Sequence, residues 1–156
     1  MKSQANARSR QRGVSLIEVM IAVFVLAIGL LGAAGMQLSA LKYTDSSRMN
    51  SQASFIVYDI IDRMRANADP VQLPQYAIAS LAAVPGAAAS IRDQDLIDFA
   101  ENLNSLPSPE ARIAVNGTQV AVTISWSEAR AAGNDEAGQP SMGSFSVTTN
   151  VSVTAP

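Results

Sequence analysis

The chain has 156 residues, of which 48% are hydrophobic, 15% charged and 5% aromatic, a size that suits one domain with an appendage. It contains no cysteine and no histidine, which excludes disulfides, Cys/His metal sites and the Ser-His-Asp and Cys-His nucleophile systems. The net charge of -2 gives no indication of a nucleic-acid partner.

The N-terminal segment combines a basic tip with a long apolar run. Four basic residues and no acid lie in the first thirteen residues, whereas seven basic residues face thirteen acidic ones from Val14 onward. Val19 to Met36 contain no charged or strongly polar side chain, and eighteen residues are the lower limit for spanning a hydrocarbon core of about 30 Å. The positive-inside rule places the N-terminus in the cytoplasm. We therefore expect one transmembrane helix over about residues 16–38.

Two simpler interpretations fit this segment less well. The apolar run is longer than the ~7–15 residues of a secretory signal and lacks a clear cleavage site. A plain membrane anchor does not explain Glu18, because a carboxylate at the start of a spanning helix is costly to desolvate and usually marks a function. The alternative for Glu18 is an acid that the helix macrodipole favours.

The segment Arg12 to Val19, which reads RGVSLIEV, resembles the class III signal of type IV pilins and their relatives in type II secretion. The resemblance implies that prepilin peptidase cleaves between Gly13 and Val14 on the cytoplasmic face, and that Val14 is then N-methylated. It also implies that Glu18 neutralises the N-terminal ammonium of a neighbouring subunit during assembly.

The chain departs from this family at two places. Val14 stands where the family usually has phenylalanine, which is expected to permit cleavage and to slow methylation. The proline midway along the apolar helix of many major pilins and their C-terminal disulfide loop are both missing. Gly29, Gly32 and Gly35 stand where that proline would be, which allows either a locally melted turn or close packing between membrane helices.

The spacing of apolar residues predicts that the helix continues past the membrane to about Ala66. Glycine and proline are absent between Met36 and Asn67, and Asn67 with Pro70 provides the stop. One apolar face follows helical spacing and is expected to lie on a globular core; it comprises Ala53, Ile56, Val57, Ile60, Ile61 and Met64.

The region after the long helix predicts a loop and a second helix. Residues 69–92 are rich in Ala, Pro, Gly and Ser and are expected to hold a short helical turn near 76–83. The second helix is predicted from Asp93 to Pro107, with Leu96, Ile97, Ala100 and Leu103 as its apolar face. Its acids lack the glycine of a calcium loop, so we interpret them as a solvated face rather than a metal site; they are Asp93, Asp95, Asp98 and Glu101.

The C-terminal third predicts three strands. Residues 111–115 and 118–126 alternate and flank Asn116-Gly117, a strong hairpin signal. Residues 127–143 form a polar loop, which is the candidate contact region for surface binding or else a connection without a ligand. A third strand is predicted over 144–154, with a break near Asn150. The inward side chains of the second strand are expected to cover the long helix; they are Val120, Val122, Ile124 and Trp126.

The predicted fold is therefore α+β, a pilin-like lollipop with a long N-terminal helix, half transmembrane, on a small antiparallel sheet. Residues 1–13 are the expected cleaved leader, 14–66 the helix, and 67–156 a periplasmic or extracellular head with a short helix and about three strands. Within the family, the PilV type of minor pilin is the most similar, on three segments: Ile28–Gly32, Asp62–Asn67 and Ile124–Trp126.

This resemblance implies a minor pilin that helps to initiate type IV pilus assembly and is incorporated at low abundance, supporting surface attachment and twitching motility. The alternatives are a minor pseudopilin of a type II secretion system and a tip-located adhesin. The implied partners are prepilin peptidase, other minor and major pilins through the N-terminal helix, and inner-membrane lipid. The implied location is the bacterial inner membrane, then the pilus. We expect no enzyme activity, cofactor, metal, nucleic acid or small-molecule substrate.

Overall fold

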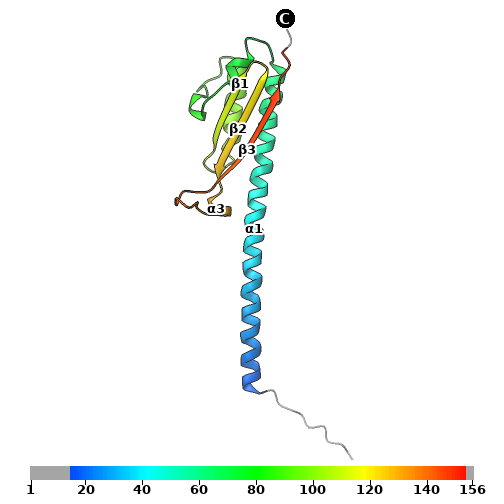
Figure 1. Ribbon diagram of the computed structural model, residues 1–156, viewed down its shortest axis with the longest axis vertical. Coiled ribbons are helices and arrows are strands. Elements are labelled where there is room, and N and C mark those ends of the chain that lie inside the picture. The colour runs from blue at the N-terminus through cyan, green and yellow to red at the C-terminus, as the bar shows by residue number, and fades with distance from the viewer. Residues whose placement is uncertain (1–14, 154–156) are drawn as a thin grey trace, which may run out of the picture. The chain divides into compact units, whose positions relative to one another are not determined.

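A computed structural model describes residues 15–153, which divide after Ala40 into two compact units (Figure 1). Helix α1 runs from Leu16 to Ala66 and supplies the first unit as well as part of the second. The helix ends at Ala66, as predicted, and its start at Leu16 lies two residues after residue 14, the predicted start. Gly29, Gly32 and Gly35 lie in regular α-helix, so the locally melted turn is not present in this structure. The leader and Val14 lie outside the described residues.

The second unit, called the body below (residues 41–153), is built from the C-terminal part of α1 and a three-stranded sheet (Figure 1). The predicted apolar face of α1 is buried throughout, with Met49 extending it by one turn. The inward side chains of the second strand are all fully buried against it, Trp126 among them. Helix and sheet therefore share one hydrophobic core, as helix-on-sheet layers require.

The sheet has strand order β1-β2-β3 and is antiparallel throughout. Its strands are β1 (Glu110–Asn116), β2 (Gln119–Ser127) and β3 (Met142–Asn150). Strand β3 therefore begins two residues earlier than predicted and ends at Asn150, where the sequence indicated only a break. Beyond this point Val151 is buried and its N–H donates to the Thr118 carbonyl over 2.8 Å.

The hairpin turn lies one residue later than predicted. Asn116 pairs with Gln119, so the two central residues of the turn are Gly117 and Thr118. Gly117 has φ 61°, a left-handed value that costs glycine little. Glycine at the first central position suits a type II′ turn, whereas an Asn-Gly turn of type I′ would need left-handed backbone at both positions.

Short helices cover the rest of the body. The predicted turn near residues 76–83 is two 3₁₀ turns, η1 (Leu73–Tyr76) and η2 (Leu81–Ala83). Helix α2 (Ile91–Leu103) begins two residues before Asp93, because the Ser90 hydroxyl accepts from the Asp93 N–H over 3.1 Å and caps the helix. It ends at Leu103, before Pro107. The predicted polar loop contains a further short helix, α3 (Ala129–Ala132).

The buried face of α2 differs from the predicted one. Phe99 is buried, whereas Ile97 and Ala100 are only half-buried. Asp95 shares the buried face with Leu96, Phe99 and Leu103, at the spacing i, i+1, i+4 and i+8. The apolar residues alone do not reveal this helical phase, because one position of the buried stripe is a charged residue.

Candidate functional site

Glu18 lies in the first turn of α1. The Ser15 carbonyl accepts from the N–H of Glu18 over 3.0 Å and from that of Val19 over 3.2 Å, so the helix starts directly before the acid. The Glu18 side chain is exposed, and it has no hydrogen-bond or ion-pair partner among residues 15–153. The carboxylate is therefore available to a cation from outside this part of the chain. Gly13 and Val14, the other predicted site residues, lie outside the described residues.

The helix that follows Glu18 is apolar and uncovered. Between Leu16 and Met36 every large apolar side chain is at least half exposed, from 50% at Val19 to 79% at Leu16. The most apolar eighteen-residue window of α1 has a mean hydropathy of 2.6 and no buried residue. By length and composition this helix can cross a membrane. An uncovered surface of this size needs lipid or other helices around it.

A second polar group lies in the body at the end of α1. Asp95 of α2 is 5% exposed, and it is the one buried charged residue in the described part of the chain. It accepts from the Tyr76 hydroxyl over 2.6 Å, from the Asn67 amide over 3.1 Å and from the Arg63 guanidinium over 3.2 Å. Arg63 also bonds Asp98 over 2.7 Å. These contacts fasten α2 to α1, so the predicted solvated face is wrong for Asp95.

The electrostatics of this cluster follow from its contacts. Burial, and next the hydrogen bond to Asp95, raises the pKa of Tyr76 to about 12. The hydrogen bond to Asp98 is the main cause that raises the pKa of Arg63 above its ordinary value. Gln94, and next Arg63, lowers the pKa of Asp98. Each hydrogen bond thus favours one proton state, in which the tyrosine stays neutral and donates while the carboxylates accept.

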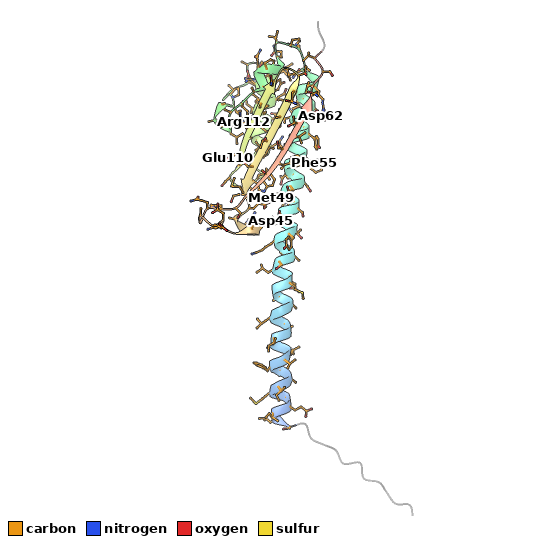
Figure 2. The ribbon with its side chains drawn as sticks, in the orientation of Figure 1. Asp45, Met49, Phe55, Asp62, Glu110 and Arg112 are labelled. Carbon is orange, nitrogen blue, oxygen red and sulfur yellow. The ribbon has the colours of Figure 1, made fainter. Side chains whose placement is uncertain are left out.

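The segment 127–143 is folded onto α1 rather than being a free polar loop. Oε1 of Glu128 accepts from the Ser46 hydroxyl over 3.0 Å and from the Trp126 indole over 3.3 Å. Arg130 lies 3.5 Å from Asp45, whose position on α1 is labelled in Figure 2. Asp135 accepts from the N–H groups of Ala137 and Gln139 and closes its own turn. The local contacts account for these polar residues without a ligand.

Two open hollows of about 510 and 540 Å³ lie on the body. The first is next to the Asp95 cluster and is lined in part by Asn67, Tyr76 and Arg92. The second borders β1 at Glu110 and Arg112. Across residues 15–153 no group of three or more His, Cys, Asp or Glu side chains is arranged to hold a metal ion.

Comparison with known proteins identifies the N-terminal segment. No curated protein and no solved structure matches the chain. Residues 8–34 match the family model of the prokaryotic N-terminal methylation motif. This match includes Gly13, Val14, Glu18 and nearly all of the apolar run. The chain therefore carries the class III signal of type IV pilin-like proteins, joined to a long apolar helix and an α+β body.

Proposed function

We propose that the chain is a minor pilin, a structural subunit that enters a type IV pilus at low abundance and helps to initiate its assembly. The observation that carries the proposal is the Glu18 carboxylate, which has no partner among residues 15–153 and stands at the start of an uncovered apolar helix, inside a methylation motif. Such a helix requires an apolar environment, which lipid or other apolar helices provide, and a cationic partner for Glu18. A bundle of like helices in a pilus supplies both.

The proposed assembly contact joins Glu18 of one subunit to the N-terminal ammonium of the next. Prepilin peptidase cleaves after Gly13 at the cytoplasmic face and frees the amine of Val14. Methylation of this amine preserves its positive charge. Inside an apolar bundle an unpaired carboxylate costs several kcal/mol, so subunits that align Glu18 with a neighbouring ammonium are favoured over those that do not. The ion pair sets the register of the helices.

The proposed topology follows from the same segment. The basic leader stays in the cytoplasm, residues 16–38 cross the inner membrane, and the body lies in the periplasm until the subunit joins the pilus. The PilV type of minor pilin is the proposed relative within the family. Attachment and twitching motility are the proposed outcomes of a functional pilus.

The first test is the mass of the protein extracted from membranes. We expect a chain that begins at Val14 and carries one added methyl group. Gly13→Val is expected to leave the full-length chain uncut, because a β-branched side chain replaces the one residue without a Cβ at the cleavage site. Recovery of uncut wild-type protein from cells with active peptidase contradicts the proposal.

The second test removes the Glu18 charge. Glu18→Ala and Glu18→Gln are expected to be cleaved normally and to be lost from sheared pilus fractions, while Glu101→Ala, which removes an exposed acid of α2, is incorporated like the wild type. Normal incorporation of both Glu18 variants refutes the pairing role. A deletion strain scored for twitching and for protein export separates a pilus subunit from a type II secretion pseudopilin.

A further inference from the structure

The two edges of the sheet differ in how they are protected. The outer edge of β1 is occupied, because Ile78 and Ile113 exchange two backbone hydrogen bonds of 3.0 and 2.9 Å. The solvent face of β1 also carries Glu110 and Arg112, which are labelled in Figure 2. A covering segment and charged side chains are the usual means by which proteins prevent strand addition at an edge.

The pairing of the strands defines which backbone groups of β3 point outward. The two-residue turn makes Asn116 and Gln119 a hydrogen-bonded pair, and such pairs alternate along an antiparallel ladder. Residues of β3 opposite even-numbered β2 residues therefore bond to β2, and the outward N–H and C=O groups belong to Met142, Ser144, Ser146, Thr148 and Asn150. The N–H and C=O groups of Ile113 on β1 bond Ile78 and so point away from β2, in agreement with this alternation. Within residues 15–153 the outward groups of β3 have no partner.

Strand β3 itself carries none of the protections that β1 has. Its nine residues include no charged residue and no proline, and its pairing with β2 is continuous. Its inward side chains are only half-buried, unlike those of β2, and include Phe145 and Val147. Beneath this edge Tyr58 of α1 is 52% exposed and meets the Phe145 ring edge to face at 6.5 Å. One further strand would cover these side chains.

Building on the proposed function, we propose that the outer edge of β3 accepts an uncharged extended strand from a different pilin-like subunit in the same membrane. Main-chain hydrogen bonds supply the affinity, and alternate apolar side chains of the partner pack over Phe145 and Tyr58. The partner strand is neutral because none of the nine residues of β3 is charged, and the Arg65 guanidinium that bonds the Thr149 hydroxyl is already paired with Asp62. An unpaired charge at this edge would lose its water.

Neither head-to-tail addition nor antiparallel twofold pairing of a second copy fits this edge. Head-to-tail addition of copies needs the outer edge of β1, which Ile78 occupies. Antiparallel pairing of two β3 strands about a twofold axis would run the two α1 helices of the bodies in opposite directions. The Leu41 ends, from which the chains continue into their spanning segments, would then lie at opposite ends of the pair. Two subunits in one membrane need these ends together.

The experiment places the photo-crosslinking residue p-benzoylphenylalanine at Ser146 of the full chain in its native membrane. Side chains on neighbouring strands are about 5 Å apart, within reach of this probe. We expect an adduct with a protein that itself carries an N-terminal methylation motif, identified by mass spectrometry. The matched control places the probe at Ala114, which is exposed on the same sheet face but on β1. We expect no such adduct from that position.

Two edge variants then test the role of the main chain. Thr148→Pro removes an outward N–H without breaking the β2 ladder, and Thr148→Lys adds a charge at the edge. Each variant is expected to lower the yield of the Ser146 adduct about tenfold, which corresponds to the loss of one or two hydrogen bonds to the partner strand. Ala114→Lys is the matched control and is expected to leave the yield unchanged.

Four results overturn the inference: no adduct at Ser146, an adduct with a second copy, equal adducts from Ser146 and Ala114, or an unchanged yield in both Thr148 variants. If the chain is nevertheless cleaved after Gly13 and incorporated into pili, the edge inference alone has failed. If the chain is neither cleaved nor incorporated, the proposed function has failed as well.

Discussion

The two parts of α1, residues 16–40 and 41–66, have the same secondary structure and opposite surroundings. Leu26 in the first part is 61% exposed, whereas Ile60 in the second part is fully buried. In the first part apolar side chains occupy all sides of the helix. In the second part the buried apolar side chains form one stripe, and the large apolar and aromatic side chains outside it are exposed, namely Leu41, Tyr43, Phe55 and Tyr58. The number of apolar residues alone therefore does not show what a helix packs against, but their distribution around the helix axis does. A single apolar stripe is covered by the chain's own core, and a helix that is apolar on all sides needs an external apolar phase.

Glu18 in the N-terminal part of α1 and Asp95 in the body show the same contrast. Glu18 has no partner among the described residues, while the buried Asp95 accepts from three side chains of the body. A buried carboxylate needs such partners to remain charged inside a protein. The body satisfies the buried Asp95 from its own side chains, whereas residues 15–153 supply no partner for Glu18.

The largest expected effect tests the apolar side of this contrast. Ile60→Ala is expected to lower the free energy of unfolding of the body by about 4 kcal/mol, because the side chain is fully buried beneath the sheet. Phe55→Ala, one turn earlier on the exposed side of α1 (Figure 2), is expected to cost less than about 0.5 kcal/mol. Urea unfolding of the full chain in detergent, followed by the emission of Trp126, measures both.

Trp126 is the only tryptophan of the chain and is fully buried, so its emission reports on the core alone. Equal losses in the two variants would contradict the one-sided burial of the helix in the body. Leu26→Ala, in the uncovered part, is expected to leave the unfolding curve of the body unchanged.

The next effect concerns the Asp95 cluster. Asp95→Ala is expected to destabilise the body by about 3 kcal/mol, since the Tyr76 hydroxyl and the Asn67 amide lose a buried acceptor at once. Asp62→Ala is the matched control, because this exposed acid forms a surface pair with Arg65 that is worth about 0.5 kcal/mol. The same urea curves give both values. If the two variants are equally stable, Asp95 is not the fastening point of α2.

A smaller effect is expected at Gly143 of β3, which pairs with Trp126 of β2. A Cβ built on Gly143 would lie 2.6 Å from two atoms of the Trp126 indole and 2.8 Å from Glu128. Gly143→Ala is therefore expected to cost about 1–3 kcal/mol through overpacking. Gly86→Ala meets nothing within 4 Å and is expected to be neutral or slightly stabilising. Comparable stability of the two variants would show that β3 can move away from the indole.

The sequence predicts much of this architecture because several of its patterns are local. The buried stripe of α1, the three strands and the inward side of β2 follow from the spacing of apolar residues, and all are confirmed. The methylation motif is equally local and is confirmed over residues 8–34. Cleavage at Gly13, methylation of Val14 and the pairing of Glu18 remain predictions, since they depend on other proteins.

The features that the sequence did not predict depend on contacts between distant residues. Asp95 is buried because Arg63, Asn67 and Tyr76 reach it from other elements, and nothing in the local sequence separates it from the exposed acids of α2. The fastening of Glu128 to Ser46 joins residues 82 positions apart. The start of α2 is different, because it follows from a local signal: Ser90, three residues before Asp93, caps the helix.

The smallest expected effect concerns the proton of Tyr76. Its pKa is raised to about 12 in the folded body, so between about pH 10 and 12 the folded state keeps a proton that the unfolded state has lost. Stability is therefore expected to fall as the pH rises through this range, and to be fully present below it. Tyr76→Phe should abolish this dependence and cost about 1 kcal/mol at neutral pH, because one buried hydrogen bond is lost. Urea unfolding at pH 8, 10 and 11 measures the free energy of unfolding of both proteins. If the wild type and Tyr76→Phe lose the same amount as the pH rises, groups other than Tyr76 cause the loss.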